Sequence, residues 1–195
     1  MSMFDLTTYN PYLRVSLPSR VGSLVKWLFA RPEERRGCMT IGQCGGTYDY
    51  VNYTPFASRT HHIYIRKPFF NDNHMEHLRP FCGLVTVDIG DTSVTERGVE
   101  CLLGCKSLRY LFLWGTRVGD GVLEVLEEMQ TIDMLNLSGT RISRKVFDQI
   151  CGHLPNAFVS HREFGDHFRE LNGKEAITEW RKRDEPSDIR RWQQL

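Results

Sequence analysis

Residues that could coordinate a metal gather in one part of the chain. His74 and His77 are three residues apart, so a helix would place both imidazoles on one face. His61, His62 and Cys82 lie close to them in the sequence. However, the paired cysteine spacing of a structural zinc site does not accompany these residues. The sequence therefore predicts no metal site.

Motifs for other kinds of chemistry are also absent. No Ser or Cys lies in the strand-turn-helix pattern of a nucleophile elbow, and spacing singles out no pair of carboxylates for acid-base catalysis. Gly42, Gly45 and Gly46 have neither the Lys-Ser/Thr ending of a P-loop nor the placement of a dinucleotide-binding fingerprint. We expect no catalytic residue, no cofactor and no small-molecule substrate, and hence a protein that is not an enzyme.

Charge and composition narrow the classes of partner. The formal net charge of +1 gives no general reason to expect nucleic acid as the main partner. No apolar run is long enough to span a bilayer, so we expect membrane contact to be indirect. The six cysteines lie mostly in apolar contexts without a secretory signal, which predicts free thiols in a reducing compartment.

A repeat of 24 residues organises the centre of the chain. The stretches that begin at Leu84, Leu108 and Ile132 align without an insertion. Six positions recur in all three: Leu84/Leu108/Ile132, Val87/Leu111/Leu135, Ile89/Leu113/Leu137, Thr92/Thr116/Thr140, Val94/Val118/Ile142 and Leu102/Leu126/Ile150. A fixed period of this length is the signature of stacked structural units.

Degenerate copies flank the clear repeats. A shift of one repeat toward the N-terminus places Ile63 and Ile65 at the strand positions. A shift of two repeats places Met39 and Ile41 there. Apart from this cap strand, we expect residues 35–55 to form a loop. After the third clear unit, the sequence "LPNAFVS" supplies a closing strand at residues 157–160. Terminal units differ from inner ones because they cover the ends of the stack.

Over about residues 60–154, these positions resemble a leucine-rich repeat of the L-x-x-L-x-L-x-x-T-x-I type. The resemblance implies an α/β fold: a short leucine-rich repeat solenoid with parallel strands on the concave face, helices on the convex face, and N- and C-terminal extensions. Helical spacing and N-cap residue types place the helices at residues 95–103, 120–129 and 143–151, with Gly104 and Gly152 able to end two of them. The resemblance also implies that Thr92, Thr116 and Thr140 bond the backbone of the neighbouring turn.

Three segments follow from this assignment. Residues 1–35 form an N-terminal amphipathic segment for targeting or capping. Residues 36–160 form the leucine-rich repeat domain, with clear repeats at 84–154 and degenerate ones at 39–83. Residues 161–195 form a C-terminal docking extension.

The phase of the repeat assigns the two faces of the strand "YLFLW", residues 110–114. Leu111 and Leu113 fall at core positions, so the three aromatic residues between and beside them face outward on the concave side. Together with their register partners they form the predicted partner-binding site: Tyr110, Phe112, Trp114, Tyr64, Met134, Asp88, Asn136 and Arg66. An aromatic centre with a polar rim is typical of interaction hot spots. Two occupants of this face stay open, a partner protein and a terminal extension of the same chain.

The first 32 residues carry four basic side chains and one acidic one. This composition and the amphipathic stretch "SRVGSLVKWLFAR" are typical of a mitochondrial targeting segment, with a capping helix as the alternative. With its "SLVKWLF" segment and short threonine-type repeats, the chain resembles mitochondrial leucine-rich-repeat proteins related to ATP synthase factor B and to complex I distal membrane arm assembly components. The resemblance implies an accessory subunit or assembly factor of a respiratory complex, ATP synthase or the mitoribosome, with protein subunits as partners.

Two other functions stay open. The opening "VSLPSRVGSLVKWLF" resembles the start of an F-box, which implies a cytoplasmic substrate-recognition subunit of a ubiquitin ligase. The sequence "EERRGCMTIGQCGG" that follows Pro32 departs from that pattern, because it stands where further helices would be needed. RNA binding is suggested by Arg66, Arg109 and Arg117 beside aromatic residues, but the near-neutral charge argues against it as the main role.

Overall fold

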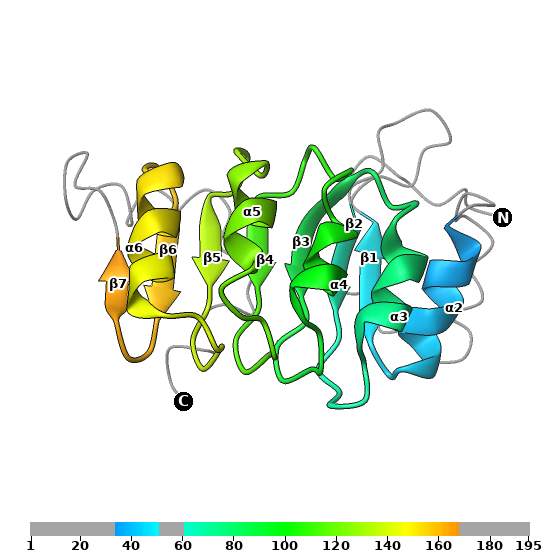
Figure 1. Cartoon of the computed structure of the whole chain (residues 1–195). Helices are drawn as coiled ribbons and strands as arrows, with labels where there is room; N and C mark the ends of the chain where they lie inside the picture. The colour runs from blue at the N-terminus through cyan, green and yellow to red at the C-terminus, as the bar shows by residue number, and fades with distance from the viewer. Residues whose placement is uncertain (1–33, 51–60, 168–195) are drawn as a thin grey trace, which may run out of the picture. The chain divides into compact units, whose positions relative to one another are not determined.

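The structure is a computed structural model that describes residues 34–50 and 61–167 of the chain. The described residues belong to one compact unit, Ser23–Arg169, of mixed α/β class. A seven-stranded sheet runs through it in the order β1 to β7 (Figure 1). The expectations for residues 1–33, 51–60 and 168–195, including the targeting helix and the docking extension, lie outside the described residues.

The strands follow one another across the sheet in sequence order. Their bounds are β1 Thr47–Tyr50, β2 His61–Tyr64, β3 Leu84–Asp88, β4 Tyr110–Phe112, β5 Met134–Asn136, β6 Phe158–His161 and β7 Gly165–His167. Strands β2 to β6 are parallel, and the outer pairs β1–β2 and β6–β7 are antiparallel. Val87 pairs with Leu111, Leu111 with Leu135, and Leu135 with Val159, so each strand lies beside residues 24 positions away, as the repeat predicts.

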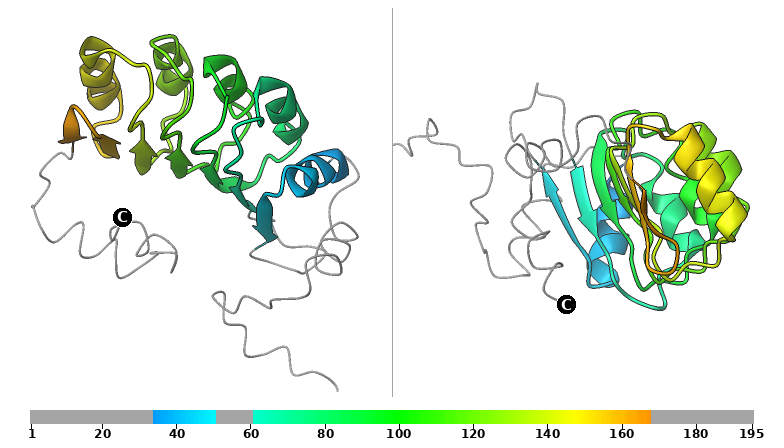
Figure 2. Two further views of the ribbon diagram at one scale, coloured as in Figure 1. Left: turned by 90° about the horizontal axis from the view of Figure 1, so that it is seen from below. Right: turned by 90° about the vertical axis from the view of Figure 1, so that its left-hand side faces the viewer.

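Helices cover one face of this sheet (Figure 2). They are α2 Arg35–Gln43, α3 Asp72–Met75, the 3₁₀ helix η1 Glu76–Leu78, α4 Glu96–Glu100, α5 Val122–Glu127 and α6 Arg144–His153. The core lies between the two layers, and Leu111 and Leu113 are fully buried in it as predicted. The degenerate unit places Ile63 and Ile65 in the same core, which confirms their predicted phase.

The threonine hydroxyls close the turn of their own unit. Thr92 Oγ1 donates to the carbonyl of Ile89 at 2.7 Å, and Thr116 and Thr140 make the same bond three residues back, at 2.6 and 2.7 Å. The expectation that these hydroxyls bond the backbone of the neighbouring turn was therefore wrong. A bond to the residue three positions back satisfies the buried hydroxyl locally and needs no second unit.

Carboxylates make one recurring set of polar links between successive units. Asp72 accepts hydrogen bonds from the backbone N–H and the hydroxyl of Thr95, at 2.8 and 2.7 Å. One period later, Glu96 accepts from the N–H of Gly119 at 3.3 Å, and a further period on, Asp120 accepts from the N–H of Ser143 at 2.6 Å. We call Asp72, Glu96 and Asp120 the carboxylate ladder. At the next position of the same phase stands Arg144, which has no acceptor, so the ladder ends at α6.

Helix α2 replaces the loop and cap strand expected around Met39 and Ile41. Cys38 and Ile41 of α2 and Cys44 at its C-terminal end are buried, and their spacing of three residues is helical and was available in the sequence. A Cβ atom at Gly37 would lie 2.2 Å from the ring of Phe81, so glycine lets α2 approach that ring closely. Gly37 and Gly42 thus both lie inside a helix, where the sequence predicts a loop.

Two predicted helix ends also differ from the structure. Helix α6 continues through Gly152 to His153, so Gly152 does not end it. Helix α4 ends at Glu100, before the predicted Leu103, and turns lead from there to the next strand. The sheet itself continues past residue 160, because β7 pairs with β6 within the first part of the expected C-terminal extension.

All six cysteines are free thiols. Within residues 34–50 and 61–167, no helix combines the length and the apolar character needed to cross a membrane.

The carboxylate ladder makes a prediction about stability. Replacement of Asp72 by Ala removes two hydrogen bonds and leaves the Thr95 N–H without its acceptor, so the free energy of unfolding should fall by about 1–3 kcal/mol. Urea denaturation measures this change. The control Glu124→Ala, at an exposed position of α5, should cost no more than about 0.5 kcal/mol. Equal losses in the two variants would show that the ladder contributes nothing specific.

Candidate functional site

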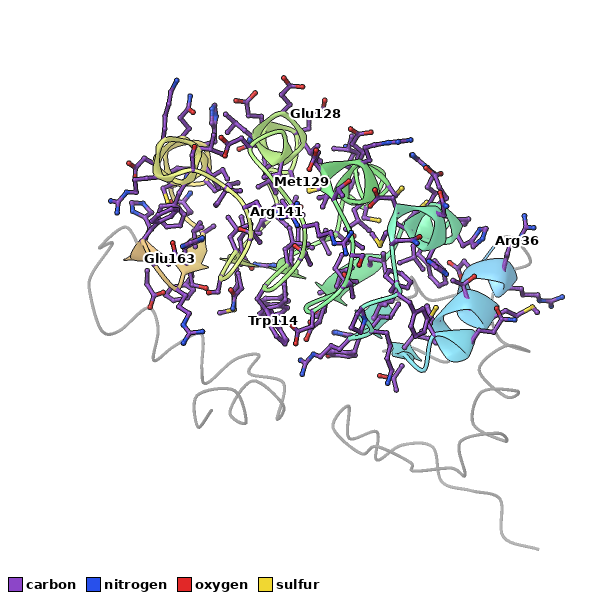
Figure 3. The ribbon with its side chains drawn as sticks, turned by 60° about the horizontal axis from the view of Figure 1, so that its bottom comes forward. Arg36, Trp114, Glu128, Met129, Arg141 and Glu163 are labelled. Carbon is purple, nitrogen blue, oxygen red and sulfur yellow. The ribbon has the colours of Figure 1, made fainter. Side chains whose placement is uncertain are left out.

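The sheet face that points away from the helices carries the predicted site. Strand pairing forms one row of neighbours from His62 through Thr86, Tyr110 and Met134 to Phe158, and a second row from Tyr64 through Asp88, Phe112 and Asn136 to Ser160. Trp114 lies on this side of the sheet as well (Figure 3). The structure thus brings the predicted residues onto one surface, which we call the sheet face.

Asp88 and Arg66 form an ion pair at the β2–β3 end of the sheet face. The other carboxylate oxygen of Asp88 accepts a hydrogen bond from the backbone N–H of Gly90 at 3.1 Å. Asp88 is only 4% exposed, and a carboxylate so buried needs both the opposite charge and the donor. The charges of Asp88 and Arg66 are therefore used within the chain.

Trp114 lies flat across the neighbouring strand. A Cβ atom at Gly90 would come within 2.2 Å of the indole Cε2 and 2.4 Å of Nε1, so the ring occupies the space that a side chain at position 90 would need. The guanidinium carbon of Arg66 lies 5.3 Å from the centre of the indole, within the range of a cation–π contact. Gly90 was missed as a site residue, although it stands between Arg66 and Trp114 at the same phase of the repeat.

Tyr110 faces away from the helices but is only 6% exposed, and its neighbour Thr86 is 2% exposed. The Thr86 hydroxyl shares a hydrogen bond with His62 Nδ1 at 2.9 Å. Several side chains of the sheet face make interactions beyond those given above: His62, Tyr64, Arg66, Tyr110, Trp114 and Phe158. We call the part formed by His62, Tyr64, Arg66, Thr86, Asp88, Tyr110 and Trp114 the closed half of the sheet face.

Strands β4 to β6 carry a different surface. Phe112, Asn136 and Ser160 are direct neighbours in register, Met134 lies beside them on β5, and all four side chains are half-buried. Asn136 Oδ1 accepts a hydrogen bond from the backbone N–H of Ser138 at 2.9 Å, which fixes the amide and leaves its NH₂ group as a donor. We call Phe112, Met134, Asn136 and Ser160 the open half of the sheet face.

Groups with chemical reactivity are used structurally in the described part of the chain. His74 Nδ1 accepts from the backbone N–H of Asn71 at 3.2 Å and so helps to cap α3. Burial raises the pKa of the Cys105 thiol to about 12 and that of Cys101 to about 11, so both stay protonated at neutral pH. Across the described ranges, no three His, Cys, Asp or Glu side chains are placed to hold a metal ion together.

Comparison with known proteins does not identify a family. No protein-family model matches the chain. No curated protein matches it. Among solved structures, the chain is similar to the internalin inlF of Listeria monocytogenes, at 17% identity and a TM-score of 0.39. The match covers 45% of this chain and 24% of the internalin, so it spans about a quarter of that protein. At this score, the likeness identifies neither the fold nor the function.

The contact between Gly90 and Trp114 can be tested by a double-mutant cycle. Gly90→Ala should lower the free energy of unfolding by about 1–3 kcal/mol, because the added methyl group overlaps the indole. In a Trp114→Ala background the same change should cost less than about 0.5 kcal/mol, because the space is then empty. Chemical denaturation of the four proteins gives the coupling. A cost that is the same in both backgrounds would contradict the placement of the ring.

Proposed function

We propose that the chain is a protein-binding module built from leucine-rich repeats, and that its partner contacts the open half of the sheet face. Support for the repeat assignment comes from the 24-residue period and the register that follows it. One observation carries the binding proposal. Phe112 and Met134 lie half-exposed and close together on adjacent strands, while helices cover the other face of the sheet. Phenylalanine and methionine are enriched in protein interfaces.

The chemistry of the face favours a polypeptide over a nucleic acid. Arg66 is paired with Asp88, and Arg109 is paired with Asp133 at 2.5 Å, so two of the arginines that suggested RNA binding are neutralised within the chain. Phosphate contacts need available cations, and the open half contains none. Its apolar side chains and the amide of Asn136 suit a surface of backbone and neutral side chains. We propose that binding, and not catalysis, is the activity of this module.

The proposed setting is a mitochondrial multiprotein complex, in which the chain serves as an accessory subunit or assembly factor. Its support is the basic, acid-poor composition of residues 1–32 and the resemblance to mitochondrial leucine-rich-repeat proteins. An F-box subunit in the cytoplasm is the second candidate. Helix α2 stands where an F-box would continue, but it packs against β1 and η1 and so belongs to the layered unit. Because α2 is part of the layered unit and not of a separate helical domain, we rank the F-box candidate second.

The open half can be tested with a matched pair of double variants. Phe112→Ser with Met134→Ser removes the two apolar side chains of the open half. Met39→Ser with Phe69→Ser removes a methionine and a phenylalanine that are 54% and 58% exposed elsewhere. Partners are first identified by affinity purification and mass spectrometry with the unmodified chain, and each variant is then titrated against the identified partner.

The open-half variant should bind at least about tenfold more weakly, since loss of one hot-spot side chain costs about 2 kcal/mol, whereas the control should bind as the unmodified chain does. Denaturation curves check that both variants fold. Undiminished binding by a folded open-half variant would overturn the proposed binding surface.

Cell fractionation tests the setting. A C-terminally tagged full chain should sediment with mitochondria and resist added protease until the membranes are opened. A variant in which Arg14, Arg20, Lys26 and Arg31 are changed to Glu should stay in the cytosol, because targeting helices need their positive charge. If the unmodified chain is found in the cytosol alone, the mitochondrial proposal is wrong and the F-box candidate moves ahead.

A further inference from the structure

The last hairpin of the sheet turns between β6 and β7. His161 pairs with Gly165 and Val159 pairs with His167 across it. The turn itself contains Arg162, Glu163 and Phe164. It lies where the carboxylate ladder has ended, so other contacts must hold this hairpin to α6.

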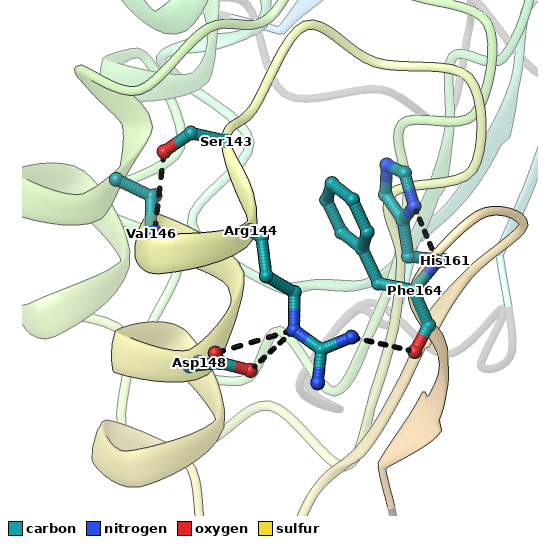
Figure 4. A network of polar contacts seen from close by, with 6 residues as sticks. All are labelled: Ser143, Arg144, Val146, Asp148, His161 and Phe164. Carbon is teal, nitrogen blue, oxygen red and sulfur yellow. Dashed lines mark hydrogen bonds and ion pairs between the residues drawn. The ribbon is translucent and has the colours of Figure 1, made fainter.

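A buried imidazole closes the turn from within the hairpin. His161 Nδ1 accepts hydrogen bonds from the backbone N–H groups of Glu163 and Phe164, at 3.2 and 3.3 Å. Figure 4 shows the bond to Phe164. A ring nitrogen that accepts carries no proton, so His161 is held as the neutral Nε2–H tautomer. The residue is 3% exposed, and within the described ranges its Nε2 has no hydrogen-bond partner.

Aromatic rings fix the imidazole against α6. The ring of Phe164 stacks on His161 with a centroid distance of 4.0 Å and an angle of 12°, and Phe147 of α6 meets the imidazole edge-on at 5.8 Å. Arg144 lies over Phe164 at 5.7 Å and donates to the Phe164 carbonyl at 3.4 Å, while its Nε bonds Asp148 at 3.0 Å. The neutral imidazole thus holds the turn closed within the hairpin, and Phe147 and Arg144 tie the closed turn to α6.

We propose that the β6–β7 hairpin is a pH-sensitive latch, in which a proton on His161 Nδ1 releases the turn from α6. A protonated Nδ1 would carry an N–H group that faces the backbone N–H groups of Glu163 and Phe164 and can no longer accept their hydrogen bonds. The turn therefore has to open before Nδ1 can bind a proton. An open turn loses the contacts of Phe164 with Phe147 and Arg144 that hold it to α6.

The charges around the turn determine the direction of the pH effect. In the described residues they are Arg162, Glu163, Asp166 and, when protonated, His167 in the hairpin, with Arg144, Lys145 and Asp148 on α6. Burial lowers the pKa of His161 below its ordinary value, and the Glu163 carboxylate partly offsets this effect. The open turn therefore binds a proton more readily than the closed one. The latch is fully stable above about pH 6.5 and weakens as the pH falls below that value.

Amide hydrogen exchange of the full chain, followed by NMR at Glu163 and Phe164, measures the opening. After correction for intrinsic exchange rates, the opening constant should rise by up to about 30-fold between pH 7.5 and pH 5. His161→Asn keeps an acceptor oxygen near the Nδ1 position but cannot titrate, so its opening constant should not change with pH. The control His153→Gln, which removes an exposed histidine of α6 paired with Glu127, should keep the response of the unmodified chain.

An opening constant that is independent of pH in the unmodified chain would overturn the latch, as would an unchanged response in His161→Asn. If the turn of the His161→Asn variant is open at every pH, the latch is tested instead by the imidazole ¹⁵N signals of His161 in the unmodified chain. A neutral Nε2–H tautomer with a titration midpoint below about 6.5 supports the latch. A midpoint at or above that value contradicts it.

Discussion

The in-register pairing of residues 24 positions apart is the constraint on which the other features of the structure depend. It brings Val87, Leu111 and Leu135 together in the core, where each is fully buried. It also brings each carboxylate of the ladder next to a backbone N–H of the following unit. A slip of one residue would turn the core side chains to solvent and break these bonds together. Hydrophobic burial and polar pairing therefore enforce the same register.

The same constraint explains why the sheet face has two halves. Arg66, Gly90 and Trp114 occupy equivalent positions in three successive units. Because Gly90 has no side chain, the indole of Trp114 packs against its backbone and contacts the guanidinium of Arg66. Beside them, Asp88 takes the charge of Arg66. The sheet-face positions of β5 and β6 contain neither a glycine nor a pair of opposite charges, and the side chains there are half-exposed. The proposed binding surface thus lies next to a surface that stabilises the fold.

Sequence reasoning predicted the parallel strands β2 to β6, their order and the residues of the sheet face, because a period shared by many positions averages out local ambiguity. It did not predict β1 or β7, which lie outside the strand positions of the repeat. It did not predict helix α2, since Gly42, Gly45 and Gly46 suggested a loop, and the close approach of Gly37 to Phe81 was not visible from local sequence. Nor did it show that Tyr110 is buried, whereas Phe112 and Trp114 are half-buried. All three side chains alternate in the same way along the strand, and their burial depends on neighbours 24 residues away. The ladder could have been found, because Asp72, Glu96 and Asp120 keep one phase.

The most direct test of the binding surface is photo-crosslinking with the full chain. A photoreactive phenylalanine analogue is placed at Asn136, in the open half, or at Glu124, on the helix face of the same unit. If a partner contacts the open half, the analogue at position 136 forms a covalent adduct with it, and the analogue at position 124 does not. An adduct from position 124 alone would place the partner on the helices and contradict the assignment of the open half as the binding surface.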